Sequence, residues 1–341
     1  MGMDSQLLVV FSIIIVALAF DFLNGFHDAA NSIATVVSTH VLSPRAAVFL
    51  AAVCNFAAAL LLNNNVATTI GRDIVSPQVL DPYLVGFGLL GAIVWNVITW
   101  YYGLPSSSSH ALVGGLAGAA ITKAGWGSLK AVGFIKVVPA IVYAPLVGLV
   151  LGRGMMLLIN WLCRNSTPRK VDHFFRRGQL VSASIFSFSH GMNDAQKTVG
   201  IIMALLISVN MHAAPAEGAK VHAPIWVVLA CYSAIALGTY LGGWRIVKTL
   251  GMRLTKLQPV GGFCAETGGG VTIVFLSLFG IPLSTTHTIA GAIVGAGSAS
   301  RRSAVRWGIA RNIMWAWILT IPCSALVAAL LEFILRPFIH P

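Results

Sequence analysis

Ten apolar segments, separated by short polar connections, make up most of this chain of 341 residues. They cover approximately residues 7–38, 46–62, 84–102, 106–122, 131–152, 180–210, 224–243, 259–279, 282–298 and 308–335. Most of them approach or exceed the roughly 20 residues that a helix needs to cross a bilayer. Because a spanning segment must satisfy its own backbone hydrogen bonds, we expect these segments to be helices. The sequence therefore predicts an all-α polytopic membrane protein with about 10–12 transmembrane elements.

The composition excludes a water-soluble globular protein. Hydrophobic residues make up 57% of the chain and charged residues only 9%, against roughly 45–50% and about 25% in soluble domains. The net charge of +12 would suggest nucleic acid in a soluble protein, but here we interpret it as membrane orientation and expect no nucleic-acid partner. The N-terminus before residue 7 has no basic residue, so the first apolar run is predicted to be a membrane helix rather than a signal peptide. The five cysteines are scattered, which favours neither disulfides nor a metal site, and no motif calls for a cofactor.

Two unusual motifs occur twice, in the same order. Residues 20–32 read FDFLNGFHDAANS and residues 186–198 read FSFSHGMNDAQKT, while GLPSSSSH at 103–110 is matched by GIPLSTTH at 280–287. This recurrence indicates an internal duplication. We expect a first transmembrane repeat over 1–152 and a second over 179–341, joined by a basic cytoplasmic linker over 153–178.

Each repeat holds five apolar segments, so the two copies are inverted in the membrane if every segment crosses it. With the N-terminus outside, 14 of the 22 Lys and Arg residues fall in inside loops and only five in outside loops. Positively charged loops favour the cytoplasm. We therefore expect a multi-pass protein of the cytoplasmic (inner) membrane with both termini outside. Inverted repeats of this kind are common among secondary transporters.

The first motif places ionisable groups inside apolar segments. If a half-helix begins near His27, with the backbone broken at Gly25, then Asp28, Asn31 and Ser32 share one helical face. The second copy would break at Gly191, and its face carries Asp194, Lys197 and Thr198. A carboxylate in hydrocarbon costs at least ~2.5–3.5 kcal/mol, so each needs a proton, a cation or a buried partner.

The second motif supplies hydroxyl groups at two predicted helix starts. Each copy has a proline followed by the residues Ser106, Ser107, Ser108 and Ser109, or Ser284, Thr285 and Thr286. Proline is favoured in the first helical turn, and Ser or Thr beside free backbone N–H groups is typical of a helix cap. Two such starts that face one another would form an oxyanion site without arginine.

Further polar residues in the apolar segments have less specific roles. Glu266 is not duplicated and is a candidate for the coupling ion or proton, as is Asp21 with less support. Asn96 is either a polar ligand or a contact between helices. His110 and His287 either carry protons or pack their helix starts. A serine hydrolase lacks support, because no GxSxG motif is present.

These duplicated motifs resemble the signature pairs of the inorganic phosphate transporter (PiT) family, over about residues 7 to 335. The resemblance implies two inverted repeats with broken helices and helical hairpins that meet at a phosphate site, often in a homodimer. It also implies that Asp28, Asn31, Asp194 and the Ser and Thr groups surround phosphate and its coupling cations. We place Gln196 with these phosphate ligands.

The chain departs from the family's sodium-coupled members, which typically carry G-x-N-D-x-A-N in both copies. His27 replaces the first Asn, and Gln196-Lys197 replaces Ala-Asn in the second copy. Lys197 would place a fixed cation beside Asp194. This resembles the bacterial low-affinity branch, which is regarded as proton-coupled and able to carry complexes of phosphate with divalent metal.

The sequence thus predicts a phosphate symporter rather than an enzyme, driven by protons rather than sodium, with Asp28, Asp194, Lys197 and Glu266 at the coupling ion or proton. A sulfate or other oxyanion symporter and a passive anion channel remain alternatives.

Overall fold

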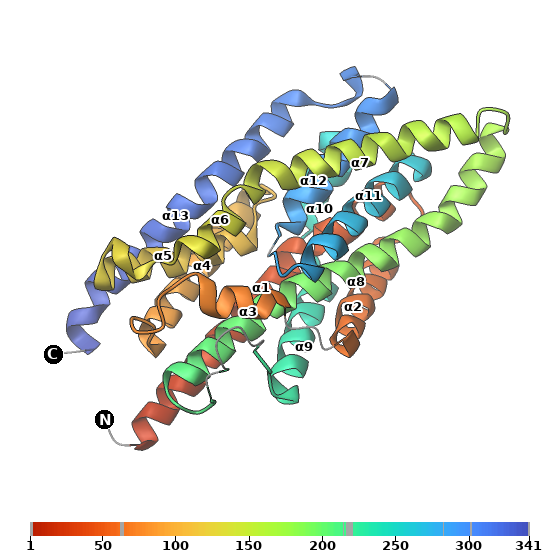
Figure 1. Ribbon diagram of the computed structural model, residues 1–341. Coiled ribbons are helices and arrows are strands. Elements are labelled where there is room, and N and C mark those ends of the chain that lie inside the picture. Colours follow the sequence, from red (N-terminus) through yellow and green to blue (C-terminus); the bar gives the residue numbers. More distant parts are fainter. Residues whose placement is uncertain are drawn as a thin grey trace.

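The computed structural model describes residues 3–61, 65–213, 215, 221–281, 283–300 and 302–339, and these residues form helices joined by short connections (Figure 1). Three residues used above lie outside the described residues. They are Pro282, which belongs to the second motif, and Lys220 and Arg301, which count in the charge asymmetry. The first half contains α1 (Met3–Ser38), α2 (Pro44–Ala57), η1 (Ala58–Leu61), α3 (Asn65–Asp73), α4 (Pro82–Tyr102), α5 (Ser108–Ala124), η2 (Trp126–Ser128), α6 (Ala131–Val137) and α7 (Ala140–Leu162).

The second half repeats this order with few changes. It contains α8 (Pro168–Ser208), α9 (Ile225–Leu241), α10 (Trp244–Val247), η3 (Lys248–Leu254), α11 (Pro259–Leu278), α12 (Thr285–Ser300), η4 (Arg302–Ala304) and α13 (Trp307–Ile339). Even small features recur. An isolated β-bridge joins Val75 to Leu129 in the first half, and another joins Thr255 to Val305 in the second.

Six described helical segments are long and apolar enough to cross a membrane. They are Gln6–Ser38, Pro44–Leu61, Pro82–Tyr102, Ala131–Leu162, Pro259–Leu278 and Trp307–Phe338. A seventh span arises if Ile225–Leu241 and Trp244–Leu254, which are bent by 60° at their junction, count as one. Helices α5 and α12 have only 17 and 16 residues and form hairpins with α4 and α11. The chain is therefore an all-helical, multi-pass membrane protein, as predicted.

The outer surface of the helices is apolar, as a lipid environment requires. Large hydrophobic side chains on α1 and α13 are widely exposed, among them Phe11 (59%), Ile15 (67%) and Phe333 (72%). Polar side chains are instead buried toward the middle, including both copies of the duplicated motifs. This inverted distribution suits a protein whose surroundings are hydrocarbon and whose function lies inside.

The two halves are packed into one another. Helix α2 packs on α8 of the other half, while α9 packs on α1; likewise α5 packs on α13, and α12 on α7. Helices α1 and α8 run antiparallel, because Asp28 lies beside Asp194 while Thr39 donates a hydrogen bond to Gln179 at 2.9 Å. Both chain ends lie at one end of the molecule, and the α7–α8 connection lies at the other (Figure 1). These reciprocal contacts are those expected of two copies in opposite orientation.

The predicted breaks at Gly25 and Gly191 were wrong, because α1 and α8 are uninterrupted helices of 36 and 41 residues. Both glycines instead allow helices to approach closely. A Cβ atom on Gly25 would lie 2.1 Å from the carbonyl oxygen of Ile235 in α9, and one on Gly191 would lie 2.5 Å from that of Asn55 in α2. Each glycine therefore marks the crossing of one repeat's first helix with the other repeat's second helix.

The segment 153–178 is also largely helical. Helix α7 continues to Leu162 and α8 begins at Pro168, so only residues 163–167 form the turn between the two halves. Most of the basic side chains assigned to the linker therefore extend from helix ends.

Candidate functional site

The starts of α5 and α12 have the same cap and face each other. The Ser107 hydroxyl accepts a hydrogen bond from the backbone N–H of His110 at 3.2 Å, and Ser284 accepts one from His287 at the same distance. The rings of His110 and His287 lie 4.8 Å apart between centroids. Two helix N-termini, each with a positive dipole end, thus converge in the buried centre of the molecule.

Hydroxyl groups from both helix starts reach Asp28 on α1. Ser108 donates a hydrogen bond to Asp28 Oδ2 at 3.0 Å, and Thr286 donates one to Asp28 Oδ1 at 3.3 Å. One turn further along α1, the Asn31 amide donates to Thr286 at 2.9 Å and to Thr285 at 3.3 Å. The structure therefore brings together five of the predicted site residues from three distant parts of the sequence.

The second carboxylate, Asp194 on α8, is held by nitrogen donors. Lys197 Nζ lies 2.6 Å from Asp194 Oδ1 and also donates to Leu283 O at 3.0 Å and to the Ser109 hydroxyl. Asn193 donates to the same Asp194 oxygen at 2.7 Å. Lys197 is only 1% exposed, so its ammonium is a fully buried cation. Such a charge is tolerated only beside an opposite charge and hydrogen-bond acceptors.

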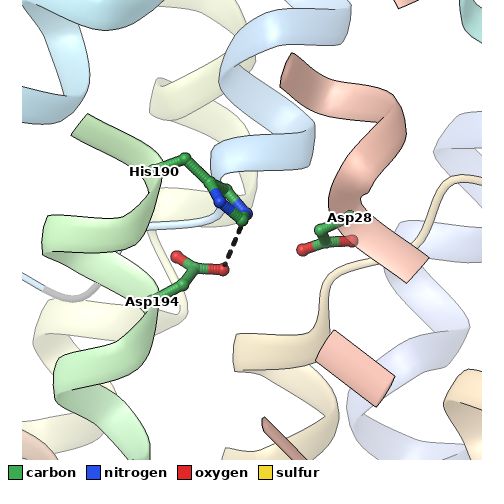
Figure 2. A group of neighbouring side chains, drawn as sticks. All are labelled: Asp28, His190 and Asp194. Carbon is green, nitrogen blue, oxygen red and sulfur yellow. Dashed lines mark ion pairs between the residues drawn. The ribbon is translucent and has the colours of Figure 1, made fainter. Parts of the chain in front are cut away.

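Asp28, His190 and Asp194 converge between α1 and α8 (Figure 2). One polar atom of each lies within 4.8 Å of those of the other two, and His190 Nε2 is 3.5 Å from Asp194 Oδ2. Two carboxylates and an imidazole are groups that can bind a cation or share protons. However, Lys197 already compensates Asp194, and His27 Nδ1 lies 2.7 Å from Asp28 Oδ1. We therefore assign no resident metal to these residues.

Gln196 and Glu266 lie apart from this centre, and Ser106 lies at its edge. Gln196 accepts a hydrogen bond from Val66 N at the start of α3, at 3.0 Å. Ser106 donates to Thr99 on α4 at 2.8 Å, and its hydroxyl lies 3.4 Å from Nε2 of His27, the residue before Asp28. Glu266 on α11 belongs to a separate buried cluster, where it accepts hydrogen bonds from Thr35 at 2.6 Å and from Gln179 at 3.0 Å.

Two asparagines were missed as site residues. Asn24 accepts a hydrogen bond from Ser108 at 2.6 Å, and Asn193 contacts both Asp194 and the carbonyl of Leu283. A signal for Asn193 was present, because it precedes the aspartate in the second motif as His27 does in the first. Asn24 lies one helical turn before Asp28, so it shares the same face.

The arrangement is suited to binding a small oxyanion in a buried site. Its donors are hydroxyls and backbone N–H groups at two helix starts, with one buried ammonium, and its acceptors are two carboxylates. The whole group lies inside a bundle of apolar helices. Fold and site together define a membrane transport protein.

Comparison with known proteins identifies its family. A model of the Phosphate transporter family (PHO4) matches residues 24–170 and 163–328. A Rhizobium meliloti (strain 1021) protein is 53% identical over 321 residues, which cover 94% of this chain and 95% of its own length. A Bacillus subtilis (strain 168) protein is 45% identical over 336 residues, covering 98% and 99%. Both are named probable low-affinity inorganic phosphate transporter.

A solved structure titled "The sodium-dependent phosphate transporter" has the same fold. It matches with a TM-score of 0.86 and 25% sequence identity, over 96% of this chain and 99% of its own. The chain belongs to the phosphate transporter family, whose members are transport proteins rather than enzymes.

Proposed function

We propose that this protein is a secondary active symporter that carries inorganic phosphate across the cytoplasmic membrane together with protons. The observation that carries this proposal is the convergence of the α5 and α12 starts on Asp28, with Lys197 and Asp194 beside them. The names of the relatives support phosphate as the substrate. The coupling ion is argued from this chain's own residues.

Phosphate would bind between the two helix starts. The hydroxyls of Ser108 and Thr286 donate to Asp28 here, and they can turn to donate to a phosphate oxygen instead. Ser109 and the Lys197 ammonium would contact the anion from the other side, because Lys197 already donates to the Ser109 hydroxyl. Free backbone N–H groups in the first turns complete a donor set that suits a tetrahedral oxyanion.

Proton coupling is favoured by the partners of the two carboxylates. In the second motif an ammonium stands where the first motif has Asn31, so Lys197 occupies the electrostatic role of a cation beside Asp194. The first carboxylate is contacted by an imidazole, which can gain or lose a proton. Glu266, fully buried with three hydroxyl or amide donors, is a further candidate for carrying a proton.

Alternating access would follow from movement of the two interlocked repeats around this central site. Each repeat contributes one helix start and one carboxylate, so a tilt of one repeat against the other would open the site to one side at a time. We also propose a homodimer, which rests on the family resemblance alone.

Uptake of radiolabelled phosphate into proteoliposomes tests the function. We expect uptake driven by an imposed pH gradient, in the absence of sodium and with or without a divalent metal. Uptake that is indifferent to both a pH and a sodium gradient would contradict symport. Absence of phosphate uptake, with sulfate carried instead, would contradict the substrate.

Sodium coupling is the second candidate, because the solved structure of similar fold is titled sodium-dependent. A sodium gradient imposed at equal pH on both sides separates the two. Only a sodium-coupled protein would then accumulate phosphate.

A further inference from the structure

An apolar groove of about 320 Å³ lies between α7, α12 and α13. Its walls are aliphatic side chains of α7 and α12, such as Leu149 and Val294, and one face of α13 from Trp307 to Ile318. At ~1.5 Å of rise per residue this face is ~16 Å long, about half of the ~30 Å thickness of the hydrocarbon core of a bilayer. The groove therefore has about the depth of one leaflet.

The groove lies where two groups of helices meet. Helix α13 packs on α4 and α5, whereas α7 packs on α11 and α12. The first group carries the α5 start of the candidate site, and the second group carries the α12 start. Because the groove is lined by α13 on one side and by α7 and α12 on the other, a ligand in it would contact both groups at once.

Trp317 forms the end of the groove that lies inside the molecule, near the candidate site. Its indole N–H donates a hydrogen bond to the carbonyl of Pro105, just before α5, at 3.0 Å. Its ring stacks on His287 at the start of α12, with 4.1 Å between the centroids. Trp317 is therefore in contact with both helix starts, and a chain that fills the groove would rest against it.

Three exposed arginines lie at the other end of the groove, which we call its mouth. Arg253 and Arg306 directly precede the lining residues Leu254 and Trp307, and Arg306 N donates to Leu254 O at 3.0 Å. Arg311 lies one helical turn after Trp307, at the edge of the same face of α13. None of the three forms an ion pair with another described residue. Basic pockets between membrane helices on the cytoplasmic side, where the charge asymmetry places this end, suit anionic lipid headgroups.

The first repeat pairs its charges at the equivalent place. The two β-bridges align the repeats here, so Arg253 corresponds to Asp73 and Arg306 to Lys130. Asp73 forms an ion pair with Lys136 at 2.9 Å, and Lys130 Nζ donates to a backbone carbonyl at 2.9 Å. The second repeat has an arginine in place of that aspartate, so its positive charges are left to an anion from outside the chain.

We propose that the groove is a binding site for an anionic phospholipid. One acyl chain lies between α7, α12 and α13 and reaches Trp317, and the headgroup phosphate lies among Arg253, Arg306 and Arg311. A second copy of the chain is a less suitable occupant, because a two-fold axis through the groove would bring the same arginines together, where like charges repel. This site goes beyond the proposed transport function and does not depend on the coupling ion.

Native mass spectrometry of the purified full chain in detergent tests the proposal. The protein is incubated without phosphate, with phosphatidylglycerol or with phosphatidylcholine of identical acyl chains. We expect at least fivefold more retained phosphatidylglycerol than phosphatidylcholine, and a larger rise in unfolding temperature with phosphatidylglycerol, because a ligand of the folded state stabilises it. Arg253→Asp, which copies the first repeat, should reduce the preference to within about twofold. Ala310→Phe, which fills the groove, should lower phosphatidylglycerol retention at least fivefold.

The matched controls carry the same substitutions outside the groove. Arg169→Asp changes an exposed arginine at the start of α8, and Ala329→Phe changes a half-buried alanine of α13 beyond the groove. Both should retain lipid as the unaltered protein does. Equal retention of the two lipids by the unaltered protein, or an undiminished preference in Arg253→Asp, would overturn the proposal. A dimer that Ala310→Phe converts to a monomer, with retained lipid unchanged, would also overturn it and assign the groove to a second copy.

Discussion

At the residue scale, equivalent positions of the duplicated motif carry side chains of different chemistry. Asp28 and Asp194 are equivalent, but the residue after one helical turn is Asn31 in the first repeat and Lys197 in the second. Asn31 donates to hydroxyls of α12, whereas Lys197 donates to Asp194 itself. One carboxylate is therefore paired with a lysine, whereas the other is contacted by hydroxyls and an imidazole.

Removing either carboxylate should abolish coupled transport. We expect Asp28→Asn and Asp194→Asn each to lower gradient-driven phosphate uptake at least tenfold, because each loses an ionisable group while keeping its shape. Membrane insertion should be unaffected, as measured by yield and by size-exclusion chromatography. Asp172→Asn is the control, since Asp172 is an exposed residue in a surface ion pair with Arg176. Near-normal uptake in both site variants would mean that the coupling site lies elsewhere.

Replacing the fixed cation should change the ion dependence. In Lys197→Asn the second motif gains the residue of the first, and Asp194 loses an ammonium at 2.6 Å. We expect phosphate uptake to become stimulated by sodium, measured as the ratio of uptake with and without a sodium gradient. Lys170→Asn, at an exposed position near the start of α8, should leave this ratio unchanged. An unaltered ratio in Lys197→Asn would remove the support for the fixed-charge role.

At the element scale, the sequence predicted the helices well but not how they continue or cross. Apolar length located the helical segments, because hydrocarbon leaves the backbone few alternatives, whereas the two hairpins were expected only from the family resemblance. The polar motif in α1 was interpreted as a break, yet Asp28 and Asn31 point from an intact helix toward hydroxyls some 80 and 255 residues away. The local sequence gives no information about partners so far away in the chain. The polar motif was therefore equally compatible with an intact helix and with a broken one.

The crossing glycines should be sensitive to a single methyl group. In Gly25→Ala the new Cβ would lie 2.1 Å from Ile235 O, and in Gly191→Ala 2.5 Å from Asn55 O. Because both obstacles are backbone atoms, the helices must separate, which costs about 1–3 kcal/mol by analogy with overpacked cores. We expect a lower unfolding temperature in detergent for both variants. Gly154→Ala on α7, where a Cβ meets nothing within 4 Å, should be neutral or slightly stabilising. Equal unfolding temperatures in all three would contradict the close approach.

At the scale of the whole molecule, the positions of the termini and of the α7–α8 turn agree with the expected inverted duplication. An inverted repeat of two halves returns the chain to the side where it began, and both ends do lie opposite residues 163–167 (Figure 1). The charge asymmetry adds the direction, because the basic side chains near that turn, such as Arg164 and Arg169, are exposed. We therefore expect the turn in the cytoplasm and the termini outside.

Cysteine labelling in intact cells can test this orientation. In a variant without the five native cysteines, Gln6→Cys and Asn165→Cys place a single exposed thiol at opposite ends of the molecule. A membrane-impermeant maleimide should label the first in intact cells and the second only after the membrane is opened. The reverse pattern would show that the basic residues do not set the orientation. Labelling of both in intact cells would place the start of α1 and the α7–α8 turn on the same side of the membrane. The antiparallel packing of α1 and α8 around one central site does not allow this.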